Sequence, residues 1–388
     1  MAITGSNEAA GGRLRLGMVG GGKDAFIGAV HRIASRIDDE YELVAGALSS
    51  TPERSQESGA ALGLKRVYDD YKSMAIREAR RKDGIDAVAI VTPNHMHYPA
   101  AREFLKRGIH VICDKPLTST LPDAKKLAAL AGKTDALFVL THNYTGYPMV
   151  RQARDMVATG RLGKLRLVQV EYAQDWLTEA EESGDNKQAK WRTDPTQTGA
   201  GGAVGDIGTH AFNLASFVSG LMVEKLAADL TSFVPGRQVD DNTHVMMRFD
   251  GGARGLLWAS QVAPGNENAL RLRVYGDKGG LDWRQEDPNY LWFTPFGEEK
   301  RLITRGGAGS GDSAARTSRI PPGHPEGYLE GFANIYTEAA RAIRAQKADQ
   351  PIPPEVVFPT IDDGLLGVQF VDACVRSSKR DAAWVKLG

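Results

Sequence analysis

The sequence is poor in several features that mark particular classes of protein. Its 388 residues include two cysteines, Cys113 and Cys374, too few for a disulfide framework, so a reducing, cytoplasmic setting is expected. Lysine plus arginine and aspartate plus glutamate both number 48, and this balance favours neither nucleic acid nor an anionic membrane as a partner. No apolar run approaches the roughly 18 residues of a membrane-spanning helix, so none is expected.

The first residues also lack the pattern of a secretory signal. Residues 1–12 contain neither a basic segment nor an apolar one, and we expect a disordered tail there. The chain is too long for one comfortable core, so two domains are expected.

The pattern of predicted strands and helices changes near residue 145. Before it, short apolar runs alternate with helical patterns, which is typical of a parallel sheet. After it, strands joined by turns such as Asp250-Gly251-Gly252 indicate antiparallel pairing. We therefore predict an α/β protein, with a Rossmann domain over 13–145 and an α/β domain over 146–388 that has a large open, mainly antiparallel sheet. The expected strands are 14–19, 41–48, 87–91, 110–113 and 136–140, then 165–172, 226–233, 243–249, 253–260, 270–275 and 280–283.

A glycine-rich turn follows the first expected strand. Gly20 and Gly22 open a G-x-G-x-x-A match, in which the backbone can approach a pyrophosphate at a helix amino terminus. In a second register, Gly28 closes the turn after a short insertion, which would leave Phe26 and Ile27 near the cofactor. Both registers remain open, and in this βαβ context either one predicts dinucleotide binding.

The end of the second expected strand bears on the choice of nucleotide. No acid stands where it would bind the ribose 2′-hydroxyl of NAD. Ser49 and Ser50 can instead hydrogen-bond a phosphate, which Arg54 or Lys23 can neutralise. Alternatively, the serines are ordinary loop residues and NAD is used without an acid. The pattern slightly favours NADP over NAD.

A lysine, an aspartate and a histidine supply the chemistry. Lys115 ends a buried apolar strand, where open α/β sheets bind their ligands, and Pro116 follows it. Asp206 and His210 stand four residues apart, which places them on one face of a helix. Together the three can move a proton on and off a hydroxyl. Two metal ligands would not fill a coordination shell, so no metal is expected.

With Thr92-Pro93-Asn94-His95-Met96-His97 and Asp114-Lys115-Pro116 added, the chain resembles the Gfo/Idh/MocA family over roughly residues 14–388. The resemblance implies NAD(P)-dependent oxidation or reduction of sugars, inositols and related polyols, and pairing of copies through the carboxyl-terminal sheet. It also implies catalytic roles for Lys115, Asp206 and His210. Two departures stand out: Asp114 replaces the usual glutamate, and the glycine turn carries an insertion.

Several other polar residues are weaker candidates. Asn143 can face the nicotinamide or cap a turn, and Tyr172, Asp175 and Trp176 can line a sugar pocket or pack in the core. His324 is weaker still. The predicted cofactor contacts in the middle of the chain are Thr92, Pro93, Asn94, His97, Asp114 and Asn143; the predicted substrate contacts are Lys115, Tyr172, Asp175, Trp176, Asp206, His210 and His324.

These residues predict reversible hydride transfer between NAD(P) and a carbinol carbon of a sugar-like substrate. In oxidation, His210 would take the hydroxyl proton, Asp206 would orient His210 or bind a neighbouring hydroxyl, and Lys115 would hold the oxygen. Lys115 is the alternative acid–base. The rival hypotheses are a non-catalytic NADP-sensing regulator on the same fold and a reductase of an imine or tetrapyrrole. A homodimer or homotetramer is expected, with no nucleic-acid or membrane partner.

Overall fold

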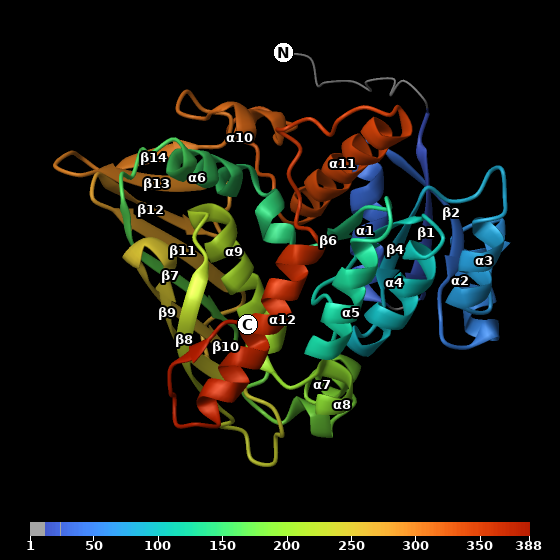
Figure 1. Ribbon diagram of the computed structural model, residues 1–388, viewed down its shortest axis with the longest axis horizontal. Coiled ribbons are helices and arrows are strands. Elements are labelled where there is room, and N and C mark those ends of the chain that lie inside the picture. Colours follow the sequence, from blue (N-terminus) through green and yellow to red (C-terminus); the bar gives the residue numbers. More distant parts are fainter. Residues whose placement is uncertain (1–11, 24) are drawn as a thin grey trace. The chain divides into compact units, whose positions relative to one another are not determined.

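The computed structural model describes residues 12–23 and 25–388, which form two compact units (Figure 1). The first unit comprises the described residues up to Thr118, together with Pro122–Gly146 and Tyr328–Leu365. The second comprises Ser119–Leu121, Tyr147–Gly327 and Leu366–Gly388. The first unit therefore extends beyond the expected 13–145. Of the expected disordered tail, only Gly12 lies within the described residues.

The first unit is built on a six-stranded parallel sheet in the order β3-β2-β1-β4-β5-β6. This is the doubly wound order, with its switch point between β1 and β4, and it confirms the predicted Rossmann domain. The short strand β3 was not predicted. The strands are β1 (Leu14–Gly20), β2 (Tyr41–Ala47), β3 (Arg66–Val67), β4 (Ala87–Val91), β5 (His110–Cys113) and β6 (Phe138–Leu140).

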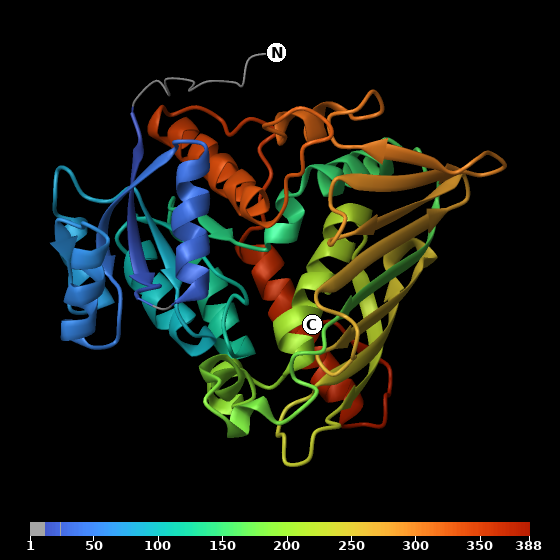
Figure 2. The ribbon, with the colours of Figure 1, turned by 180° about the vertical axis from the view of Figure 1, so that it is seen from behind.

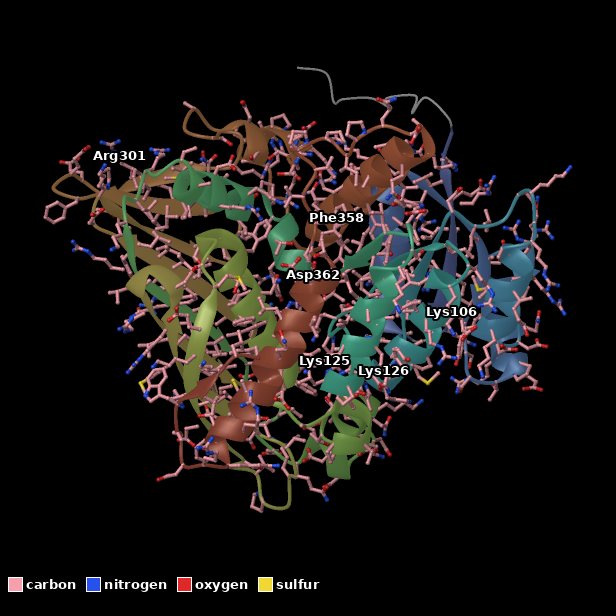
Figure 3. The ribbon with its side chains drawn as sticks, in the orientation of Figure 1. Lys106, Lys125, Lys126, Arg301, Phe358 and Asp362 are labelled. Carbon is pink, nitrogen blue, oxygen red and sulfur yellow. The ribbon has the colours of Figure 1, made fainter. Side chains whose placement is uncertain are left out.

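Helices cover this parallel sheet because each presents an apolar stripe to it. On α5, Ala124 and Leu127 are buried, whereas Lys125 and Lys126 are exposed and point outward (Figure 3). Helices α1 and α11 pack together over one cluster with the central strands, although they lie about 300 residues apart. The elements are α1 (Phe26–Ile37), α2 (Pro52–Ala61), α3 (Tyr71–Glu78), η1 (Asn94–Met96), α4 (His97–Leu105), α5 (Leu121–Ala131), η2 (Asn143–Gly146) and α11 (Tyr328–Lys347).

The second unit contains a nine-stranded sheet in the order β14-β13-β12-β11-β7-β10-β9-β8-β15. Its neighbours pair antiparallel except for β7 and β10, which are parallel, so the predicted mainly antiparallel sheet is confirmed. Strands β13, β14 and β15 were not predicted. The strands are β7 (Leu165–Ala173), β8 (Val223–Thr231), β9 (Asn242–Phe249), β10 (Arg254–Ser260), β11 (Ala269–Gly276), β12 (Gly279–Arg284), β13 (Tyr290–Pro295), β14 (Arg301–Thr304) and β15 (Val385–Lys386).

Helices α6, α9 and α12 lie on one face of this second sheet (Figure 2). The opposite face carries exposed apolar side chains, among them Leu167, Met246, Leu256 and Trp292. None of the helices in the described chain is long and apolar enough to cross a membrane. The remaining elements are α6 (Pro148–Ala158), η3 (Glu181–Ser183), α7 (Lys187–Arg192), α8 (Pro195–Thr198), η4 (Val204–Gly208), α9 (Thr209–Ser219), η5 (Asp250–Gly252), α10 (Asp312–Arg316) and α12 (Ile361–Ser378).

The polar stretch after β14 is held in place by a buried ion pair. Arg305 lies 2.8 Å from Glu326, and both side chains are almost fully buried. The Arg305 guanidinium also donates to the backbone oxygens of Ile320 and Pro321. A buried arginine with this many acceptors fixes the path of the backbone around it.

Candidate active site

The glycine turn after β1 leaves backbone exposed where a side chain would block it. Gly20 and Gly21 have φ values of 77° and 68°, which favour glycine. A Cβ at Gly22 would lie 2.6 Å from the Leu48 carbonyl oxygen. Helix α1 then begins at Phe26, and Ala25 at its N-cap has no polar side chain to cap it. The first-turn N–H groups are therefore available to an anion.

The structure also distinguishes the two registers of this turn. A Cβ at Gly28 would lie 2.4 Å from the Gly21 Cα, so Gly28 is the glycine that lets α1 pack against the turn. The register with the insertion is therefore the one that the structure supports. The insertion brings Phe26 to the start of α1, where the ring is 69% exposed, whereas Ile27 is half-buried.

The segment after β2 has fewer features of a phosphate site than the glycine turn has. Ser50 and Arg54 are exposed, and the Ser49 hydroxyl accepts from the Thr51 N–H at 3.4 Å. Lys23 forms an exposed ion pair with Glu57 at 2.9 Å. A 2′-phosphate would therefore meet serine hydroxyls and Arg54, and would compete with Glu57 for Lys23.

The histidine of the T-P-N-x-x-H motif holds backbone in place. His97 is fully buried, with Nδ1 at 2.7 Å from the Pro116 oxygen and Nε2 at 2.9 Å from the Thr92 oxygen. Burial lowers its pKa. Both ring nitrogens thus face carbonyl oxygens, and the ring lies between the loop after β4 and the loop after β5. The contact of His97 with the cofactor stays a prediction. Asn94 is buried in that first loop and Pro93 is exposed.

Lys115 follows β5 at the carboxyl edge of the parallel sheet and is half-buried. Its N–H donates to Asp114 Oδ1 at 2.9 Å, and the Thr141 hydroxyl donates to the same oxygen at 3.1 Å. Asp114 therefore fixes the backbone from which Lys115 extends. Burial, and then the positive charge of Lys115, lower the pKa of His142 to about 3. The lysine charge thus acts on the end of β6 as well.

Two buried polar atoms at this edge have no hydrogen-bond partner among the described residues. They are Asn143 Nδ2, after β6, and Thr92 Oγ1, after β4. Buried polar groups are rarely left unsatisfied, so each is a place where a bound molecule can supply the partner. Both lie on loops that follow strands of the same parallel sheet as the glycine turn.

A second polar cluster lies in the second unit, at a π-helical turn. Asp206 lies in η4, just before α9, where the sequence predicted regular α-helix. The buried Asp240 side chain holds this segment by accepting from the Gly202 and Val204 N–H groups at 2.6 and 2.8 Å. Turns of this kind often occur at functional sites.

The Asp206 carboxylate is the centre of that cluster. Its Oδ2 accepts from Arg192 Nε at 3.2 Å and from Gln261 Nε2 at 3.0 Å. Gln174 Oε1 joins the network by accepting from Gln261 Nε2 at 3.4 Å, and it also accepts from the Trp176 indole N–H at 3.1 Å. The Tyr172 hydroxyl donates to Asn268 at 2.8 Å, and the Tyr172 ring lies 6.3 Å, edge-on, from the buried His210 ring. Tyr172, Trp176, Asp206 and His210 therefore belong to one polar neighbourhood.

Family comparisons match both halves of the chain. Residues 14–142 match the model of an oxidoreductase family with an NAD-binding Rossmann fold, and residues 150–282 match the GFO/IDH/MocA C-terminal domain. An uncharacterized oxidoreductase of Bacillus subtilis, YfiI, is 35% identical over 380 residues, covering 96% of this chain and 97% of its own. The chain belongs to the Gfo/Idh/MocA oxidoreductase family.

Solved structures of similar proteins agree with this assignment. An oxidoreductase from Sinorhizobium meliloti is 68% identical, with a TM-score of 0.88 and coverage of 96% of this chain and 99% of its own. An inositol dehydrogenase homolog from Azotobacter vinelandii, complexed with NADH and myo-inositol, is 35% identical, with a TM-score of 0.91 and coverage of 97% and 98%. As a member of the family, this protein is an NAD(P)-dependent oxidoreductase.

Two predicted substrate contacts have other roles in the structure. Asp175 Oδ2 accepts from the Gly265 N–H at 3.2 Å, which stabilises a turn after β10. His324 is exposed, and its carbonyl oxygen accepts from Arg305.

The amide groups of the Asp206 network were not predicted from the sequence. Gln174 and Gln261 each follow a strand, β7 and β10, and those two strands are parallel neighbours. Their carboxyl ends therefore lie side by side, which brings the two amides within 3.4 Å. The turns in this half of the sequence indicated antiparallel pairing, so no signal pointed to this juxtaposition.

Proposed function

We propose that this protein catalyses reversible oxidation of a carbinol carbon in a sugar, inositol or related polyol, with NAD(P) as the nucleotide. The observation that carries the proposal is the Asp206 network, in which a carboxylate, a guanidinium and several amides offer closely spaced donors and acceptors. Neighbouring hydroxyl groups are the ligands that such a set recognises. The inositol dehydrogenase homolog with bound NADH and myo-inositol supports the same substrate class.

The residues at the edge of the parallel sheet fit a dinucleotide. Gly20, Gly21 and Gly22 would hold the pyrophosphate against the start of α1. Asn143 Nδ2 and Thr92 Oγ1, both buried without a partner among the described residues, would donate to the nicotinamide end. When bound, the nucleotide supplies the hydride acceptor, and the protein supplies orientation and proton transfer.

We assign the proton-transfer role to His210, with Lys115 as the group that holds the substrate oxygen. An ammonium group stabilises negative charge that develops on that oxygen as its proton leaves. Asp206, already bound to Arg192 and Gln261, would bind a neighbouring hydroxyl or orient His210. The alternative, with Lys115 as the base, predicts that His210 variants keep most of their turnover.

A preference for NADP rests on Ser49 and Ser50, which stand where an acid would repel the 2′-phosphate. The Lys23–Glu57 ion pair opposes it, since the carboxylate lies beside one of the two available cations. Titration of both nucleotides decides the matter: tighter NADP binding supports the preference, and tighter NAD binding refutes it.

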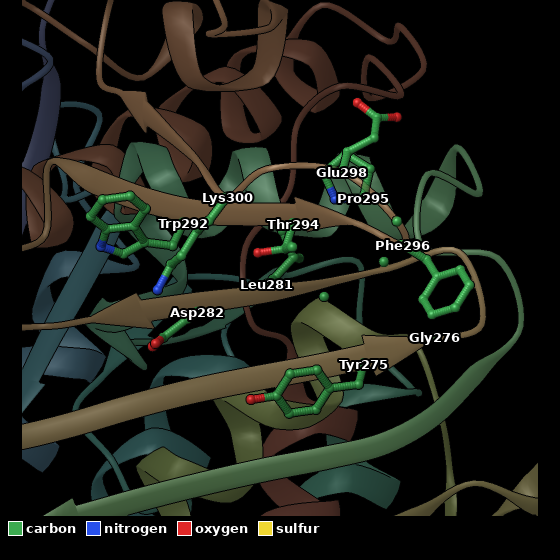
Figure 4. A pocket seen from close by; sticks show the side chains of 13 residues that line it. Tyr275, Gly276, Leu281, Asp282, Trp292, Thr294, Pro295, Phe296, Glu298 and Lys300 are labelled. Atoms are coloured by element: carbon green, nitrogen blue, oxygen red, sulfur yellow. The ribbon is translucent and has the colours of Figure 1, made fainter.

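Copies of the chain are proposed to pair through the open face of the nine-stranded sheet. That face combines exposed apolar residues with an ionic network of Arg271, Asp282 and Glu171, a mixture typical of interfaces. A pocket of about 430 Å³, whose lining includes Tyr275 and Trp292, makes part of the sheet surface concave (Figure 4). Light scattering should give a multiple of 42.0 kDa; a monomer at micromolar concentration would contradict the pairing.

The experiment that tests the proposed activity is a screen of sugars, inositols and polyols, followed by the absorbance of NAD(P)H. Turnover with at least one compound is expected. Tight nucleotide binding with no turnover across the screen would instead favour the non-catalytic regulator.

A further inference from the structure

A histidine outside the polar sites already described lies close to the base of Lys115. His31 is on α1, three residues after Gly28, and is fully buried. Its Nδ1 lies 2.8 Å from the Tyr336 hydroxyl on α11, and its ring packs 5.1 Å from the Phe332 ring. Its Nε2 has no hydrogen-bond partner among the described residues. All of these residues belong to the first unit.

The Nε2 atom of His31 faces the Asp114 carboxylate, which already accepts two hydrogen bonds. It lies 4.0 Å from Asp114 Oδ1. That same oxygen accepts from the Lys115 N–H and from the Thr141 hydroxyl. His31 Nε2 therefore lies next to the atom that fixes the backbone of Lys115, although the 4.0 Å separation is longer than a hydrogen bond.

The hydrogen-bond pattern selects one tautomer of His31. Burial lowers the pKa of His31 to about 4, so the ring is neutral near pH 7 and carries one N–H. If the Tyr336 hydroxyl donates to Nδ1, the proton sits on Nε2 and points towards the Asp114 carboxylate. The other tautomer would place a nitrogen lone pair opposite that carboxylate, which is electrostatically unfavourable.

We propose that Tyr336 and His31 are positioning residues for Lys115, forming a buried relay from the Tyr336 hydroxyl through His31 to Asp114 Oδ1. The Tyr336 hydroxyl sets the tautomer, the Nε2–H attracts the carboxylate electrostatically across 4.0 Å, and the carboxylate holds the strand end that carries the lysine. The relay also joins the helix of the glycine turn to the lysine. This inference rests on the proposed function, because it assigns Lys115 to the reaction.

Kinetics of four variants test the relay. His31→Leu removes the donor at nearly constant volume, and Tyr336→Phe removes the hydroxyl that sets the tautomer. Each should lower kcat about tenfold, with KM and nucleotide Kd within about twofold, because a displaced catalytic group affects turnover more than binding. His31→Gln places an amide donor near the former Nε2 and should recover most of kcat.

Tyr41→Phe is the matched control for these kinetics. Tyr41 is buried in the same aromatic stack, 5.4 Å from the Tyr336 ring, and its hydroxyl donates to the Tyr336 carbonyl oxygen at 3.1 Å, so it does not touch His31. Its kcat should stay at the level of the unmodified enzyme while its Tm falls about as much as that of Tyr336→Phe. Equal kcat in the two tyrosine variants would overturn the relay.

The tautomer can be observed without any substrate. The chain has eight histidines, so selective 15N labelling gives a tractable spectrum, and His31→Gln assigns the resonance. The relay predicts a protonated Nε2 and a bare Nδ1, with the pattern altered in Tyr336→Phe. A protonated Nδ1 would overturn it. If no polyol is oxidised, the proposed function fails, while this spectrum still decides the relay.

Discussion

The two polar sites of this protein are made in different ways. The edge of the parallel sheet is shaped by backbone: three consecutive glycines, a histidine with both nitrogens on carbonyl groups, and an aspartate that holds the next N–H. The Asp206 network is made of side chains from α7, η4 and the ends of β7 and β10. We therefore expect steric changes to matter most in the first site, and changes of polar groups in the second.

Lys115 is the exception in the first site, because there its side chain, and not the backbone, carries the proposed chemistry. Its removal should therefore have the largest effect on turnover. Lys115→Ala should lower turnover by about 10²–10⁴, the range for a group that stabilises developing charge or transfers a proton. Steady-state kinetics give the loss, and a nucleotide titration serves as the control, because the glycine turn is untouched. Near-normal turnover would remove Lys115 from the mechanism.

In the second site, the pair that carries the chemistry should behave as one unit. His210→Ala is expected to lower kcat by about 10²–10³, and the double variant with Asp206→Ala should lose scarcely more, because residues that act together are not additive. A double-mutant cycle on kcat measures this. Losses that simply multiply would show that Asp206 binds substrate independently of His210.

A steric change at the glycine turn should affect nucleotide binding more than chemistry. At Gly22→Ala the new Cβ would meet the Leu48 oxygen at 2.6 Å, so nucleotide Kd should rise about tenfold or more. Gly132→Ala is the control, since its Cβ would meet only one atom, at 3.7 Å. Equal nucleotide Kd values for the two variants would contradict the claim that the backbone of the turn contacts the nucleotide.

The two units should also differ in their response to acid. Burial lowers the pKa of His31 and His110 to about 4 and that of His142 to about 3, and all three lie in the first unit. Unfolding lets each bind a proton below about pH 6.5, so the stability they contribute near neutral pH is lost progressively from about pH 6.5 down to about pH 4 for His31 and His110 and about pH 3 for His142.

Hydrogen exchange at pH 7.5 and pH 5 compares the units directly. Protection of β1, β4 and β5 should fall by more than that of β9 and β10. A uniform loss of protection across both sheets would show that the buried histidines do not set the acid response.

The same contrast explains how much the sequence could predict. Features made by the backbone can be predicted from local sequence: the glycine turn, the strand ending at Lys115 and the parallel sheet all follow from short patterns. Even there, only the structure shows that Gly28 closes the turn and that His97 binds carbonyl groups. These outcomes depend on contacts between segments far apart in the chain.

The side-chain contacts of the Asp206 network and of His31 were much harder to predict from the sequence. Gln174 and Gln261 are 87 residues apart and meet only because β7 and β10 are parallel. The partnership of His31 with Tyr336 spans 305 residues and depends on α11 packing on α1, which no local periodicity reveals. On β13, Leu291 and Phe293 are buried whereas Tyr290 and Trp292 are exposed, so the exposed aromatic residues obscure the alternation that would mark a strand.

Transfer of label from substrate to nucleotide tests the central claim most directly. A polyol that the screen identifies, deuterated at the carbinol carbon, is incubated with the enzyme and the oxidised nucleotide, and the reduced nucleotide is analysed by mass spectrometry. Hydride transfer predicts that the reduced nucleotide made by the unmodified enzyme carries one deuterium. At equal nucleotide occupancy, Lys115→Ala should form almost no deuterated nucleotide in the same time. Reduced nucleotide without deuterium, or equal transfer by both proteins, would contradict the proposed reaction and its assignment to Lys115.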